Sequence, residues 1–180
     1  MRRIYWIWIL GLMACENSEQ QLTDWTRNIQ LREEATQVES YLSQGGILRA
    51  KLQAPKMFRI SADTVYAEFP KTLHCDFFNA SKQLESRLDS RYGIYYESLN
   101  RVFLRDSVVV ITTKGDTLLT QQLWWDQNTQ LFSTETPVTY KAPGKRIYAA
   151  EGVEATQDLS RITFRKTVGT MRVDNTGMPF

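Results

Sequence analysis

The chain has 180 residues and a net charge of +2, from 22 basic and 20 acidic side chains that are scattered through one another. No basic stripe forms, which argues against a nucleic-acid partner. A hydrophobic fraction of 42% is ordinary for one globular domain and argues against a bundle of membrane helices or a disordered chain. Five Trp, eight Tyr and eight Phe lie mostly beside Val, Ile and Thr, which favours β-sheets.

The N-terminus has the layout of an export signal. Arg2 and Arg3 form a basic head, and the apolar run over residues 4–13 is shorter than the ~20 residues that span a bilayer. We therefore expect residues 1–14 to be a lipoprotein signal peptide.

Its end, Leu12-Met13-Ala14-Cys15, resembles the bacterial lipobox, in which the cysteine is acylated and becomes the new N-terminus. Cys15 is thus the expected lipid attachment site and the expected contact with a membrane. The alternative is that Cys15 stays a free thiol at the end of an uncleaved anchor.

The remainder divides into three parts. Residues 15–35 are polar and predict a tether, residues 36–168 predict a β domain, and residues 169–180 predict a loose tail with Gly, Asn and Pro. In the segment 47–54, Leu48, Ala50, Leu52 and Ala54 alternate with the polar Arg49, Lys51 and Gln53. Such alternation predicts a strand with one covered and one solvent-exposed face.

Turn residues recur at short intervals, at residues 43–46, 79–82, 114–116, 126–128 and 143–145. Strands this frequent, with no helical segment between them, predict an antiparallel sandwich or jelly roll.

A degenerate repeat runs through this domain. Its first position is occupied by Leu52, Leu88, Leu118 and Ile147, at intervals of 36, 30 and 29 residues. A small residue or Thr follows two positions later, and the pattern predicts units of about two strands that stack on one another.

Five segments, in order, resemble the lipoprotein-type branch of the LptC family, and the repeat resembles the OstA-type unit of periplasmic lipopolysaccharide-transport proteins. They are Tyr66–Phe78, Ser90–Glu97, Arg105–Val110, Leu123–Asp126 and Glu151–Asp158. The resemblance covers roughly residues 38–165. It implies an all-β fold, an open and twisted antiparallel β jelly roll.

The resemblance also implies a function. A family member accepts lipopolysaccharide from the inner-membrane ABC transporter, whose subunits are LptF/LptG-like. It passes the lipid to the next jelly roll of a trans-periplasmic bridge, an LptA-like protein. The implied location is the periplasm of a Gram-negative bacterium, at the inner membrane. Many members carry a transmembrane helix, whereas this chain has a short signal ending at Cys15. The alternative is a structural envelope lipoprotein that binds only protein partners.

Acyl chains need a long apolar groove, and one face of the strands supplies candidates for it. Either these residues line a lipopolysaccharide groove, or they fill a closed core. The candidates are Leu48, Leu52, Leu84, Leu88, Val108, Val110 and Leu118.

Sequence motifs for catalysis are absent: there is no phosphate-binding loop, no nucleophile elbow and no Cys/His metal spacing. We expect no enzyme activity, metal or cofactor. The lone His74 favours a packing or surface role, and Cys75 a small buried hydrophobe. Trp124 and Trp125 are neighbours on a strand, so they face opposite sides and do not form one sugar-stacking platform.

Overall fold

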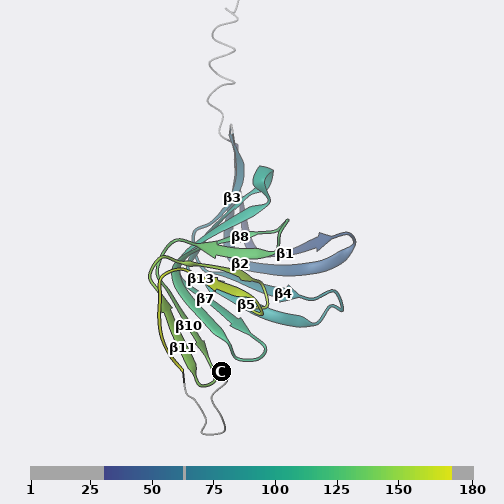
Figure 1. Cartoon of the computed structure of the whole chain (residues 1–180). Helices are drawn as coiled ribbons and strands as arrows, with labels where there is room; N and C mark the ends of the chain where they lie inside the picture. The colour runs from purple at the N-terminus through teal and green to yellow at the C-terminus, as the bar shows by residue number, and fades with distance from the viewer. Residues whose placement is uncertain (1–30, 63, 172–180) are drawn as a thin grey trace, which may run out of the picture. The chain divides into compact units, whose positions relative to one another are not determined.

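The computed structural model describes residues 31–62 and 64–171, which fold as one antiparallel sheet of 14 strands (Figure 1). The predicted all-β, open jelly-roll architecture is confirmed. The strands are β1 (Leu31–Gln44), β2 (Ile47–Ser61), β3 (Val65–Phe69), β4 (Leu73–Phe78), β5 (Leu84–Ser90), β6 (Tyr92–Tyr96), β7 (Arg101–Thr112), β8 (Thr117–Asp126), β9 (Leu131–Thr134), β10 (Val138–Ala142), β11 (Lys145–Ala149), β12 (Val153–Thr156), β13 (Ile162–Phe164) and β14 (Thr167–Met171), with a 3-10 turn η1 (Glu97–Leu99) before β7.

Three long strands bend and so divide the sheet into two layers. The first half of β2 pairs with β4 and its second half with β3. The first half of β7 pairs with β6 and its second half with β5. The first half of β8 pairs with β10 and its second half with β9. The first layer therefore contains β4, β5, β10, β11 and β14, and the second contains β3, β6, β9, β12 and β13.

The bend in β7 has a visible backbone cause. Asp106 and Ser107 have φ angles of 65° and 60°, and the register with β8 shifts between Arg105 and Val108. Left-handed residues interrupt a ladder and turn the strand. The bend in β2 contains Pro55, which has no N–H to give to a neighbouring strand.

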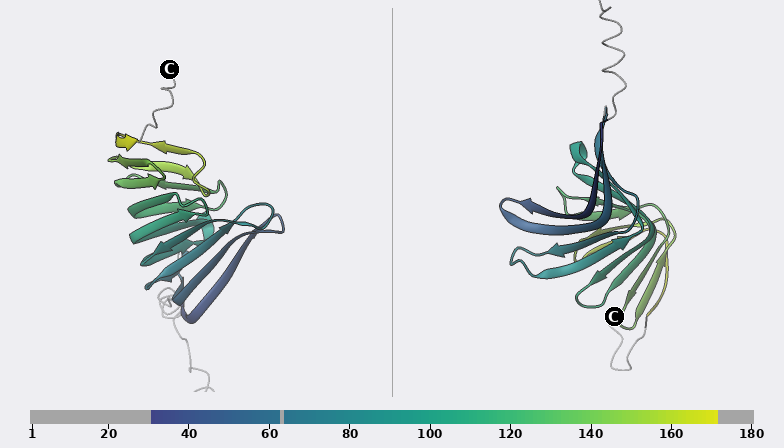
Figure 2. Two further views of the ribbon diagram at one scale, coloured as in Figure 1. Left: turned by 90° about the horizontal axis from the view of Figure 1, so that it is seen from below. Right: turned by 180° about the vertical axis from the view of Figure 1, so that it is seen from behind.

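Figure 2 shows the strands stacked in chain order, from the β1–β2 hairpin to the C-terminal strands. At the first end of the stack, β1 pairs only with β2 in the part of the chain that the structure describes. At the other end, β13 pairs only with β12 and β14 only with β11 among the described residues. Both ends of the stack thus carry a strand with one unpaired edge.

The repeat seen in the sequence corresponds to this geometry. Its first-position residues, Leu52, Leu88, Leu118 and Ile147, lie on β2, β5, β8 and β11, which are every second strand of the first layer. Each repeat therefore supplies two neighbouring strands there. Gly152, at the end of the fourth unit, has φ +92°, and a Cβ on it would lie 1.9 Å from the carbonyl oxygen of Thr134.

The strands reach beyond the expected limits of the β domain. β1 begins at Leu31, inside the segment 15–35 for which the sequence predicts a tether, and β14 continues to Met171. Polar and charged residues at the start of β1 can be in a strand because they lie at an edge of the sheet. The expected signal peptide, Cys15 and the rest of the tail lie outside the described residues. No helix among the described residues is long and apolar enough to cross a membrane.

Candidate functional site

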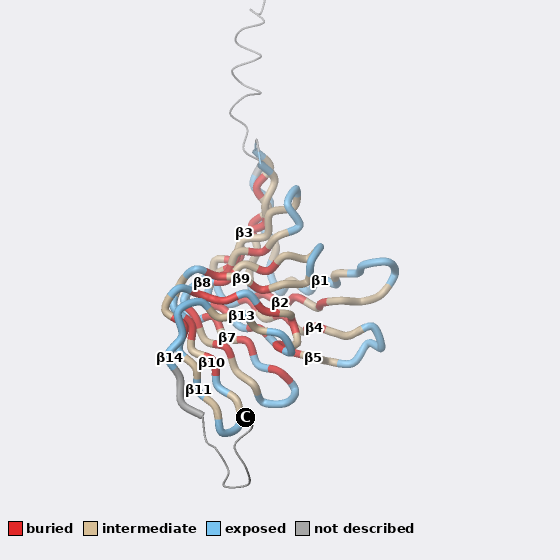
Figure 3. The backbone as a smooth tube through the Cα atoms, in the orientation of Figure 1, coloured by how far each residue is buried: buried red, intermediate tan, exposed pale blue. Residues whose placement is uncertain are grey.

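A continuous row of side chains crosses the inner face of the first layer. Residues that lie directly opposite one another on paired strands point to the same face of a sheet. The register links seven such positions from β2 to β11, namely Leu52, Cys75, Leu88, Val110, Leu118, Tyr140 and Ile147. Six of these residues are buried and Ile147 is half-buried. Figure 3 shows that buried positions recur along neighbouring strands of the sheet. We call this set the inner row.

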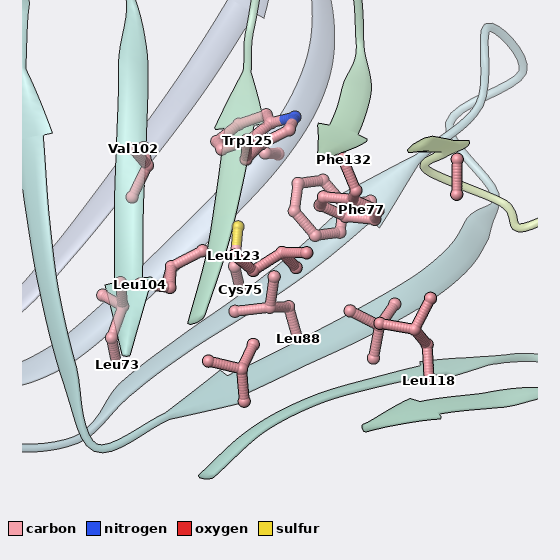
Figure 4. Close-up of a cluster of buried hydrophobic side chains, with 14 of the residues drawn as sticks. Leu73, Cys75, Phe77, Leu88, Val102, Leu104, Leu118, Leu123, Trp125 and Phe132 are labelled. Carbon is pink, nitrogen blue, oxygen red and sulfur yellow. The ribbon is translucent and has the colours of Figure 1, made fainter. Parts of the chain in front are cut away.

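The second layer presents a matching row toward the same interior. Its members are Tyr95, Val102, Trp125, Phe132, Ala155 and Ile162, linked strand by strand from β6 to β13. Phe77 of β4 contacts two of them, with ring centroids 4.8 Å from Trp125 and 5.4 Å from Phe132 (Figure 4). The two layers thus share one apolar interior that runs across the strands.

Five of the seven groove candidates lie in this interior. Leu52, Leu88, Val110 and Leu118 belong to the inner row, and Val108 is 1% exposed beside it. The other two, Leu48 and Leu84, are half-buried near the ends of hairpins. Each lies beyond a register shift, where Leu48 pairs with Ser43 and Leu84 with Phe78.

The sequence did not identify several members of the interior. Cys75 was expected to be buried, but not as part of the row, and Tyr140 and the second-layer row were not expected there. A search for alternation over residues 138–142 could have found Tyr140, because Val138, Tyr140 and Ala142 share one strand face. The bends determine which strands of the two layers face each other. No local sequence pattern reveals where these bends lie.

At the strand ends away from the bends of β2, β7 and β8, the interior opens into a pocket of about 230 Å³. Its lining residues come from the β1–β2 hairpin, the end of β8 with the following turn, Asn100, and the turn after β12. They include Leu42, Arg49, Trp125, Gln127 and Gln157. Gln130 donates a hydrogen bond to the Oε1 atom of Gln44 at 2.9 Å, which links the hairpin to the β8–β9 turn beside the pocket. We call this the end pocket.

The place of Arg49 in the end pocket differs from the alternation in the sequence, which predicts a solvent-facing side chain. Leu42 pairs with Ala50, but the next residue, Ser43, pairs with Leu48. Arg49 is therefore an extra residue in β2, a β-bulge, and bulges redirect side chains. The prediction for Arg49 is wrong for this reason, and the half-buried guanidinium group lines the pocket.

The polar side chains outside the interior contact one another through ion pairs and hydrogen bonds. The His74 ring contacts two carboxylates, with Nδ1 2.7 Å from Asp89 Oδ1 and Nε2 3.3 Å from Asp76 Oδ1. In the described part of the chain, no group of three or more His, Cys, Asp or Glu residues could hold a metal ion. Burial raises the pKa of the Cys75 thiol far above its ordinary value, so the thiol is held protonated.

Trp124 and Trp125 face opposite sides of β8, as the alternation predicts. Trp125 is 3% exposed inside, whereas Trp124 is half-buried on the outer face. There it lies beside aromatic residues of neighbouring strands, with ring centroids 5.9 Å from Tyr96 and 4.8 Å from Phe103. The outer cluster was not foreseen because its members are far apart in sequence.

One antiparallel sheet bent into two layers around a shared apolar interior defines the class of open β jelly rolls. The chain belongs to the LptC family, because the family model for LptC-related lipopolysaccharide-assembly proteins matches residues 4–172. Membership implies a role in lipopolysaccharide transport, with lipopolysaccharide and the transport complex as partners and a periplasmic place at the inner membrane. No curated protein matches the chain.

Proposed function

We propose that the protein carries lipopolysaccharide through its interior, with the acyl chains lying against the inner row. The observation that carries this proposal is the unbroken register from Leu52 to Ile147, which gives seven strands a common apolar face. A lipid chain is long and apolar, so it gains most from a surface that continues across strands.

The side chains of the two layers pack on one another, as the contact between Phe77 and Trp125 shows. Acyl chains therefore enter by parting the layers at the side away from the bends of β2, β7 and β8. The seam formed by these three strands keeps the layers joined while the opposite side opens.

Transfer is directional in this proposal. Lipopolysaccharide arrives from the LptF/LptG-like subunits of the inner-membrane ABC transporter at the β1 end, and leaves to an LptA-like protein at the β13 and β14 end. The unpaired strand edges at both ends support this, because a partner can add its own strand to such an edge. Acylation of Cys15 would hold the β1 end near the membrane.

The test is photocrosslinking in cells. A photoreactive amino acid replaces Leu118, which is fully buried in the inner row, or Leu119, which lies on the opposite face of the same strand. Lipopolysaccharide should crosslink at position 118 and not at 119. Equal crosslinking at both positions, or none at 118, would contradict an internal path.

A depletion experiment tests the transport role itself. Loss of the protein should leave newly made lipopolysaccharide at the inner membrane. Normal surface delivery after depletion would instead favour a structural envelope protein that binds only other proteins.

A further inference from the structure

The end pocket contains an unusual group of buried hydrogen-bond donors. Six buried side-chain N or O atoms of the described residues have no hydrogen-bond partner, and four of them belong to residues that line this one pocket. These atoms are Arg49 Nε, Trp125 Nε1, Gln127 Nε2 and Gln157 Nε2. Buried polar groups in native proteins are nearly always paired, so unpaired donors gathered around one pocket point to a ligand that supplies the acceptors.

The two orphans outside the pocket are explained by ion pairs. Asp76 Oδ1 lies 3.3 Å from Arg87 Nε, and Arg101 Nε lies 3.2 Å from Asp126 Oδ2. Gln127 interacts with the Tyr95 hydroxyl, so its amide has a partner within the protein. Among the described residues, no such partner accounts for Arg49 Nε, Trp125 Nε1 or Gln157 Nε2.

The chemistry of these three groups calls for a hydrogen-bond acceptor, and the positive charge of Arg49 favours an anionic one. A guanidinium and an indole N–H can only donate, and a glutamine amide can turn its NH₂ group toward an acceptor. Trp125 and Gln157 are 3% and 5% exposed, so their donors are shielded from bulk water. None of the described residues that line the pocket is acidic, and Glu85, which interacts electrostatically with Arg49, is not among them.

The fold holds the three donors in place from separate elements. The bulge in β2 directs Arg49 to the pocket. Trp125 is fixed by its edge-to-face contact with Phe77. The turn that carries Gln157 is anchored to the other layer, because Ser86 Oγ donates a 2.6 Å hydrogen bond to the Gln157 carbonyl oxygen. Such preorganised donors are typical of an oxyanion site.

We propose that the end pocket binds a phosphoryl group, and that this group belongs to the headgroup of the lipid whose chains lie in the interior. The headgroup assignment rests on the proposed function. It is favoured by position, because Leu42 and Trp125 both line the pocket and also pack within the apolar core. A phosphate held there is attached to chains that continue into that core. The volume of about 230 Å³ far exceeds the ~15 Å³ that one water needs.

The experiment measures binding to the full-length protein in detergent. The probes are lipid A with its phosphates, enzymatically dephosphorylated lipid A, and inorganic phosphate. Arg49→Gln is the main variant and Arg49→Lys is the second, since it keeps the charge but loses the planar fork. The control is Arg87→Gln, which removes the same charge from an exposed position on β5.

Arg49→Gln should weaken binding of phosphorylated lipid A by at least about tenfold, the order expected for losing a hydrogen bond to a charged group. Its affinity for the dephosphorylated lipid should not change, and Arg87→Gln should affect neither. Arg49→Lys should fall between the wild type and Arg49→Gln.

Other outcomes separate the two proposals. Equal weakening of both lipids by Arg49→Gln, or equal effects of Arg49→Gln and Arg87→Gln, would overturn the phosphoryl site while leaving the lipid path standing. Binding of inorganic phosphate that depends on Arg49, without binding of either lipid, would support a free-phosphate site and contradict both the headgroup assignment and the lipid path. If no probe binds the wild type, both proposals fail.

Discussion

Phe77 of β4 and Trp125 of β8 meet edge to face across the interior, with ring centroids 4.8 Å apart and planes at 74°. One ring comes from each layer, so this pair joins the two halves of the fold at the side of the end pocket. Phe77 is fully buried. The pair therefore both stabilises the interior and fixes the indole of Trp125, which lines the end pocket.

Phe77→Ala should lower the free energy of unfolding by about 3–5 kcal/mol, because it removes a fully buried ring and leaves a cavity. Chemical denaturation of the full-length protein followed by Trp fluorescence measures this. Phe103→Ala is the matched control, since Phe103 lies half-buried on the outer face beside Trp124. A loss for Phe103→Ala as large as that for Phe77→Ala would contradict the assignment of the interior.

Gly152→Ala should be severely destabilising, by at least ~3 kcal/mol. The residue combines a positive φ of +92° with a Cβ position only 1.9 Å from a backbone oxygen, so both strain and a clash oppose the methyl group. Gly115→Ala is the control. Its φ is +90°, but no atom lies within 4 Å of the added Cβ, so it should cost only ~1–2 kcal/mol. Thermal unfolding of the two variants, compared side by side, distinguishes these values, and equal shifts would refute the clash.

The Cys75 thiol should not react with alkylating reagents at pH 8 while the protein is folded. Burial raises its pKa, so the reactive thiolate is scarce, and the side chain is 3% exposed. Peptide mass spectrometry should find Cys75 modified only after denaturant is added. A cysteine placed at the exposed Ser107 of the β7 bend should react at once under the same conditions. Rapid labelling of native Cys75 would show that the layers open spontaneously.

The ion pair between Arg59 and Glu97 predicts a pH-dependent stability. Arg59 Nε and Nη2 donate to the Glu97 carboxylate at 2.8 and 3.2 Å, and these hydrogen bonds lower the pKa of Glu97. A depressed carboxyl pKa stabilises the fold above the unfolded value of 4.5, and the gain is lost as the pH falls through the folded value.

Glu97→Gln should therefore be less stable than the wild type at pH 7, and the difference should shrink as the pH falls below 4.5. Urea titrations at several pH values measure it. Glu135→Gln, at an exposed position before β10, is the control. A difference between Glu97→Gln and wild type that stays constant with pH would rule out the ion pair as its origin.

Much of the architecture follows from local patterns. Alternation identified the strand faces, and Gly-containing turns such as Gly45-Gly46 marked the hairpins. The repeat of Leu52, Leu88, Leu118 and Ile147 anticipated the two strands that each unit contributes to the first layer, but not those that it contributes to the second. These signals are readable because a strand with one covered face must repeat every second residue.

The residues of the end pocket could not be predicted from such local patterns. In the sequence, Arg49 fits the alternation of polar and apolar residues. In the structure its side chain lines the pocket, because a bulge changes the face to which one residue points. Gln157 reaches the pocket through a turn that is anchored by Ser86, 71 positions earlier. Contacts of this kind depend on where the strands bend. The bend in β7 lies at Asp106 and Ser107, whose positive φ angles are not indicated by any sequence pattern.

The inner row runs perpendicular to the strands, and this gives the molecule a modular length. Each repeat adds two strands at a spacing of ~4.8 Å, so it lengthens the apolar interior by ~10 Å. Gain or loss of a whole repeat leaves every inward side chain on its own face and every chain direction unchanged. Gain or loss of a single strand would reverse the direction of all that follows. The reach of such a carrier can therefore evolve in fixed steps of one repeat.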